Sequence, residues 1–193
     1  MSANSQPKWS TIKPQLTSLN SPELLDIIKG LFDLSTDNRL FLAARLSPET
    51  LGAEALKPYR KRIVVQFFPS RGFGKLNLRE ARQAIRDYRK ATSDMAGTLE
   101  LMMIYLEQGT AFTREYGDID EPFYNSLDSV LGEIAQLLTT PDGQPFYPEF
   151  SVRLQELKGV ASAIGWGYGD SVREIVDELE AVWEQNQSAA ETA

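Results

Sequence analysis

Four carboxylates lie within seven positions of the 193-residue chain, in the segment EYGDIDEPFYNSL: Glu115, Asp118, Asp120 and Glu121. Grouped acids could hold Mg²⁺ or Mn²⁺ in a carboxylate-dependent hydrolase, with Asp118, Asp120 and Glu121 as weak candidate ligands. The spacing is not that of an EF-hand calcium loop. The stretch also fits the end of one helix at Gly117 and the start of another near Pro122. Asp120 or Glu121 would then cap the second helix, and we favour this interpretation.

The chain contains no cysteine and no histidine. It therefore has no thiolate nucleophile, no disulfide and no thiolate metal site. It also has no imidazole to act as a base near neutral pH or to bind a metal. Any catalysis would depend on carboxylates, Lys, Tyr, Ser or Thr. This composition predicts a protein without enzymatic activity and without a cofactor.

Charge is segregated along the chain. Residues 57–90 hold eleven of the twenty Lys and Arg residues but two acids, a local balance of +9. Residues 91–193 hold nineteen acids and four bases, a balance of −15, and residues 1–56 are nearly neutral at −1. The net charge of −7 thus hides a basic segment followed by an acidic half.

The bases at 78–92 follow one face of a predicted helix. At about 100° per residue, five of them fall within an arc of about 100° beside the apolar face: Arg79, Arg82, Arg86, Arg89 and Lys90. Arg60 and Lys61, on the preceding predicted helix, could extend this surface.

Three interpretations of the basic stripe are open. It could be a solvated face that pairs with the acidic half of the same chain. It could dock an acidic protein, or the acidic half of a second copy. It could also bind phosphates of RNA, DNA or a nucleotide-like ligand, to which forked Arg side chains are suited. The isoelectric point near 4.8 and the scarcity of aromatic residues in the stripe count against nucleic acid.

A glycine-rich segment, GWGYGD, occupies residues 165–170. It lacks the Lys-Ser/Thr pair and the preceding strand of a phosphate-binding loop. Trp166 and Tyr168 could plug the edge of the core, which we favour, or form a second partner-binding surface.

Apolar residues recur with a helical period almost throughout the chain. The pattern predicts an all-α protein of about eight helices in consecutive antiparallel hairpins, as an irregular bundle or a short solenoid-like stack. Residues 21–185 form one predicted domain, with a flexible tail at 1–20 and a frayed tail at 186–193. The apolar run LMMIYL is too short to span a membrane, and no secretory signal is recognisable, so we expect a cytoplasmic protein.

Four segments together resemble a family of small bacterial all-helical proteins of unknown function: SPELLDIIKGLFDLS, LNLREARQAIRDYRKAT, YGDIDEPFYNSL and GWGYGD. The similarity runs from about Ser21 to about Glu180. It implies an all-helical fold in a soluble bacterial protein and carries over no catalytic residue.

We therefore expect an interaction or scaffold protein that binds an acidic partner through residues 57–90. Nucleic-acid or phosphate-ligand binding through the same Arg stripe is the alternative, and a carboxylate–metal hydrolase is a third possibility.

Overall fold

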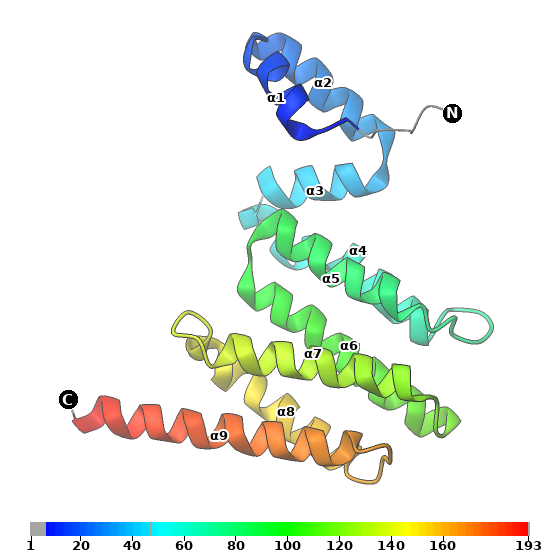
Figure 1. The fold of residues 1–193 in the computed structure, drawn as a ribbon, viewed down its shortest axis with the longest axis vertical. Coiled ribbons are helices and arrows are strands. Elements are labelled where there is room, and N and C mark those ends of the chain that lie inside the picture. Colours follow the sequence, from blue (N-terminus) through cyan, green and yellow to red (C-terminus); the bar gives the residue numbers. More distant parts are fainter. Residues whose placement is uncertain (1–6, 47, 193) are drawn as a thin grey trace.

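The structure, a computed structural model, describes residues 7–46 and 48–192, and all regular elements within these ranges are helical (Figure 1). Nine α-helices and one 3₁₀ turn occupy the described residues: α1 (Trp9–Thr17), α2 (Ser21–Leu34), α3 (Thr36–Leu46), α4 (Pro48–Phe67), α5 (Leu78–Thr92), α6 (Met95–Tyr116), α7 (Glu121–Leu138), η1 (Gln144–Phe146), α8 (Tyr147–Ala161) and α9 (Tyr168–Thr192). The all-α prediction is confirmed.

The helices are stacked in chain order along the long axis of the molecule (Figure 1). α1 and α2 lie at one end, α3 follows, and α8 and α9 lie at the other end. Between them, α4 packs on α5 and α6, and α6 packs on α7 and α8. Of the two arrangements left open by the sequence, this one is closer to a short stack than to an irregular bundle.

α6 forms the centre of the core because it is apolar around its whole circumference. Its residues from Leu101 to Leu106 are buried without interruption. α7 contributes an apolar stripe from Phe123 to Leu138, and α4, α5, α8 and α9 each contribute one buried face. One continuous core therefore joins α4 through α9.

Helix starts are fixed by short polar side chains. The Asn20 side chain accepts from the Glu23 backbone N–H at 3.0 Å, and the Glu23 carboxylate accepts from the Asn20 N–H at 2.8 Å, forming a capping box for α2. Asn77 caps α5 and Asp94 caps α6 in the same manner, through the backbone N–H three residues later. These caps set the register of α5, the helix that carries the basic stripe.

Both segments expected to be tails contain helix. α1 lies within the predicted N-terminal tail, and its last turn is closed by Thr17 and Ser18, whose hydroxyls donate to the carbonyls of Lys13 and Gln15. α9 continues through the predicted C-terminal tail as far as Thr192. Neither α1 nor α2 contains a buried residue. Residues 1–6 and 193 lie outside the described residues.

The N-terminal end of the stack is rich in exposed apolar side chains. They lie on α1, α2 and α3: Trp9, Leu25, Ile27, Ile28, Leu31, Leu34 and Leu46. Exposed apolar side chains gathered in one region are typical of surfaces that contact other molecules. Within the described ranges, none of the helices is long and apolar enough to traverse a lipid bilayer.

Candidate functional site

The carboxylate-rich segment joins α6 to α7. Gly117 adopts a positive φ of 84° and its N–H donates to the Thr113 carbonyl at 2.9 Å, which ends α6. The Asp120 carboxylate accepts from the Phe123 N–H at 2.9 Å, which starts α7. The helix-boundary interpretation is therefore confirmed for Gly117 and Asp120. Across the described parts of the chain, no three acidic side chains gather in a way that could hold a metal ion, and Asp118, Asp120 and Glu121 do not converge.

α5 turns its bases outward because its small and apolar residues face the core. Ala81, Ala84, Ile85, Tyr88 and Ala91 are buried. The exposed bases on the opposite side are Arg79, Arg86, Arg89 and Lys90, which we call the α5 basic face. Within the described ranges, these four residues form no ion pair, and Arg86 donates to the side-chain oxygen of Gln83 at 2.7 Å.

Arg82, the fifth base of the predicted stripe, is committed to the fold. Its guanidinium donates to the Glu133 carboxylate at 2.6 Å and to the Ser129 hydroxyl at 3.0 Å, both on α7. This ion pair joins the basic segment to the acidic half of the chain. Among the described residues, internal pairing with the acidic half therefore accounts for Arg82 and for none of the four residues of the α5 basic face.

Arg62 on α4 holds both acids of the basic segment. Its Nε and Nη2 donate to Glu80, at 3.0 and 2.8 Å, and its Nη1 donates to Asp87 at 3.0 Å. Nη1 also lies 3.9 Å from the Asp37 carboxylate on α3. Because Glu80 and Asp87 are drawn toward α4, they do not neutralise the bases on the outward side of α5.

Arg60 and Lys61 are exposed on α4, but they do not both extend the α5 basic face. Two positions along an α-helix turn a side chain by about 200°, so Arg60 projects from the flank of α4 opposite to Arg62. Arg62 contacts α5, and Arg60 therefore points away from it. The seven residues predicted to bind a partner thus divide into four on the α5 basic face, one tied to α7 and two on α4.

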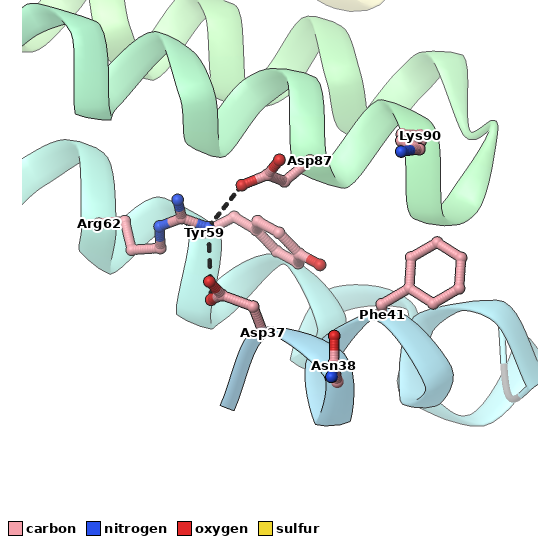
Figure 2. Close-up of a pocket in the computed structure, with 7 residues that line it drawn as sticks. All are labelled: Asp37, Asn38, Phe41, Tyr59, Arg62, Asp87 and Lys90. Carbon is pink, nitrogen blue, oxygen red and sulfur yellow. Dashed lines mark hydrogen bonds and ion pairs between the residues drawn. The ribbon is translucent and has the colours of Figure 1, made fainter. Parts of the chain in front are cut away.

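A pocket adjoins the α5 basic face where α3, α4 and α5 meet (Figure 2). Its volume is about 340 Å³, and seven residues line it: Asp37, Asn38, Phe41, Tyr59, Arg62, Asp87 and Lys90. Lys90 belongs both to the pocket and to the α5 basic face. Burial, and secondarily the nearby Asp87 carboxylate, raise the pKa of Tyr59 above its usual value of 10.0, so its hydroxyl keeps its proton at neutral pH.

Sequence reasoning named Lys90 but missed the other residues of this pocket. One signal was available in Glu80 and Asp87, which are seven positions apart and therefore share a face of the predicted helix. Two acids on the edge of a basic helix indicate a cation on a neighbouring helix, which the structure shows to be Arg62. Nothing in the sequence pattern indicated Tyr59 or Asn38.

The glycine-rich segment divides its two aromatic residues between core and surface. Tyr168 is fully buried and its hydroxyl is hydrogen-bonded to Thr110 at 2.8 Å, so it plugs the core and is not part of a second partner-binding surface. Trp166 is 56% exposed and stacks on Tyr124 with ring centroids 6.0 Å apart. Gly169 permits this arrangement because a Cβ there would lie 2.6 Å from the Ala161 carbonyl oxygen.

Most bases of residues 91–193 form ion pairs with acids of the same segment. Arg153 on α8 pairs with Glu100 and Glu107 on α6, and Lys158 pairs with Asp177 on α9. Many other acids of α8 and α9 remain exposed, including Glu156, Glu174, Glu178 and Glu180. The molecule therefore presents a basic face near its middle and an acidic surface at its C-terminal end.

Comparison with protein-family models, with curated proteins and with solved structures gave no match to this chain. The fold and the surface define the class of the molecule, an all-helical protein with segregated surface charge. The resemblance to a family of small bacterial helical proteins stays a prediction.

Proposed function

We propose that this protein is a non-enzymatic interaction protein that binds an acidic protein partner through the α5 basic face. The observation that carries the proposal is the arrangement of charge around α5. Four exposed bases lack an acidic partner among the described residues, while the two acids of the same helix are held by Arg62.

Charge of one sign on one face gives both attraction and selectivity. Arg86, Arg89 and Lys90 lie within about 6 Å of one another along the helix axis, less than the Debye length of about 8 Å at physiological ionic strength, so they act together on an approaching anion. Each guanidinium can bind a carboxylate through two parallel N–H donors, as a Lys ammonium cannot, and three of the four bases are arginines: Arg79, Arg86 and Arg89. An acidic protein surface would therefore be captured rapidly and held in a defined orientation.

Two features favour a protein partner over nucleic acid. The whole molecule carries a net charge of −7, and the acidic surface of α8 and α9 would repel a long polyanion. The exposed apolar side chains of α1, α2 and α3 offer protein-like contacts that a phosphate backbone does not use. A second copy of this chain is one acidic partner that fits, because its own α8 and α9 supply exposed carboxylates. We also propose a cytoplasmic location, as expected from the sequence.

Affinity capture from the source organism tests the class of partner. The tagged protein, incubated with lysate at low salt, is expected to retain a protein rich in Asp and Glu, identified by mass spectrometry. Retention should survive nuclease treatment and decline as salt is raised, because screening weakens contacts between exposed charges.

Recovery of nucleic acid in place of protein, with nuclease abolishing retention, would support the phosphate-binding alternative. In that case affinity should fall with salt by a log–log slope of about −0.9 for each neutralised duplex phosphate. Size-exclusion chromatography of the purified protein over a range of salt concentrations separates self-association from binding to another protein.

A further inference from the structure

The pocket between α3, α4 and α5 has the size and the lining of a small-molecule site. Its volume of about 340 Å³ lies toward the lower end of the range of roughly 300–1,000 Å³ that is typical of ligand pockets. Phe41 and Tyr59 give it aromatic walls, and charged or amide side chains converge from all three helices (Figure 2). A small ligand with a short apolar part fits such a space.

Three polar groups of this pocket have hydrogen-bonding capacity to spare. The Tyr59 side chain is only 3% exposed, yet its hydroxyl makes no hydrogen bond to any described residue. Figure 2 shows this hydroxyl directed away from Arg62, toward the side of the pocket where Phe41 and Lys90 lie. Asn38 uses its amide nitrogen to donate to the Leu31 carbonyl, at 2.6 Å, and leaves its amide oxygen available. Lys90 has no ion pair within the described ranges.

The Tyr59 ring is buried, but its hydroxyl reaches the solvent-accessible space of the pocket, where a ligand can hydrogen-bond to it in place of water. Tyr59 keeps its proton at neutral pH because burial raises its pKa, and the hydroxyl therefore donates to an acceptor. The Lys90 ammonium is a second donor. Together these two groups select an anionic oxygen.

The residues on the other side of the pocket favour a ligand group that donates hydrogen bonds. The Asp37 carboxylate is largely exposed and lies 3.9 Å from Arg62, beyond ideal hydrogen-bond length, and the Asn38 amide oxygen is an acceptor. The charged residues of the lining balance, with Arg62 and Lys90 against Asp37 and Asp87. A lining without net charge disfavours a phosphate or a dicarboxylate and favours a ligand that carries one charge of each sign.

We propose that this pocket binds a zwitterionic small molecule of the α-amino-acid type. Its carboxylate accepts from the Tyr59 hydroxyl and the Lys90 ammonium, and its ammonium group donates to Asp37 and the Asn38 amide oxygen. Its side chain lies against Phe41. This site is separate from the proposed docking of an acidic protein, although Lys90 borders both.

Isothermal titration and thermal unfolding of the full-length protein with each of the twenty common amino acids provide the test. At a concentration a hundredfold above the dissociation constant, a ligand that binds the folded state is expected to raise the midpoint of unfolding by about 5–10 °C. An alkyl carboxylate and an alkylamine that match the best amino acid in size serve as controls. Each lacks one of the two charges and is expected to bind at least about tenfold more weakly.

Two matched variants locate the site. Tyr59→Phe removes one oxygen and is expected to weaken binding about tenfold, whereas Tyr116→Phe, on an exposed tyrosine outside the pocket, should leave it unchanged. Asn38→Leu removes the amide oxygen that accepts from the ligand's ammonium group. It should weaken binding of the amino acid and leave binding of the alkyl carboxylate unchanged.

The inference is overturned if no amino acid binds, or if Tyr59→Phe binds the best ligand as well as the unaltered protein does. Tyr59→Phe leaves all four bases of the α5 basic face in place. Its result therefore separates failure of the pocket from failure of the proposed docking function.

Discussion

Replacing Phe112 by alanine is expected to lower the free energy of unfolding by about 4 kcal/mol. The ring is fully buried on α6. It contacts rings from α4, from the loop before α5 and from α7, with centroids 6.4 Å from Phe67, 5.1 Å from Phe73 and 6.3 Å from Phe123. Deleting it removes apolar contact from three segments at once and leaves a cavity that their backbones cannot close. Urea denaturation followed by circular dichroism measures the change.

Phe73→Ala is the matched control, because it deletes the same side chain from the same cluster. Phe73 is 59% exposed, so the loss is expected to stay near 1 kcal/mol. Equal losses for the two variants would show that the cluster is not the tightly packed centre described here.

The second large effect is expected for Arg62→Met, which should destabilise the protein by about 2–3 kcal/mol. The substitution keeps most of the apolar stem and removes the guanidinium that Asp37, Glu80 and Asp87 share. Three carboxylates from two helices then lose the cation that they share. The Arg62 side chain is 22% exposed, so solvent screening keeps the loss below that of a fully buried pair.

Lys29→Met provides the comparison for Arg62→Met. Lys29 pairs with Asp33 on the surface of α2, with both side chains more than half exposed, and its loss should cost less than about 0.5 kcal/mol. Adding Asp87→Asn to Arg62→Met should recover part of the stability, because it removes one of the carboxylates that have lost their cation. A double variant less stable than Arg62→Met alone would mean that the unpaired Asp87 carboxylate does not account for the loss.

The helices could be predicted from the sequence because their signals are local. The pattern at 78–92 predicted one helix with the bounds that α5 has, Leu78–Thr92, and Asn77 caps its first turn. The end of α6 at Gly117 was predicted as well, and the cap of α7 was narrowed to Asp120 or Glu121, of which the structure shows Asp120. Residues 9–17 were predicted to be part of a tail, although Trp9, Ile12 and Leu16 recur there at helical spacing; α1 is short and buries none of its side chains.

The candidate site could be predicted only in part, because its geometry depends on packing between distant segments. The 100° spacing along a helix placed five bases on one face of α5, but it could not reveal that Glu133, 51 positions away, pairs with Arg82. Three separate helices line the pocket beside Lys90. The periodicity of apolar residues within one helix does not predict which other helices pack against it. Trp166 and Tyr168 looked equivalent in sequence, and the hydrogen bond of Tyr168 to Thr110, 58 positions away, is what distinguishes the buried residue.

The charge distribution links these observations. Arg62 pairs with both acids of α5, Glu80 and Asp87, on the side that faces α4. Of the five bases, Arg82 alone is paired with the acidic half, through Glu133. What remains exposed is a compact group of bases on a molecule that is otherwise acidic. Such an arrangement is costly by self-repulsion, and binding an acidic partner would relieve it.

Charge reversal on the α5 basic face tests this claim most directly. Arg79→Glu with Arg86→Glu should leave the fold intact, because both residues are exposed and the new carboxylate at position 86 would lie four positions from both Arg82 and Lys90. The matched control, Arg114→Glu with Arg173→Glu, makes the same change of charge on exposed residues of α6 and α9. The amount of acidic protein captured from lysate by each form is the quantity to measure.

The α5 variant is expected to recover at least about tenfold less of the acidic partner than the unaltered protein, while the control recovers the same amount. Equal recovery by the α5 variant, with its circular dichroism spectrum and unfolding midpoint unchanged, would contradict the account.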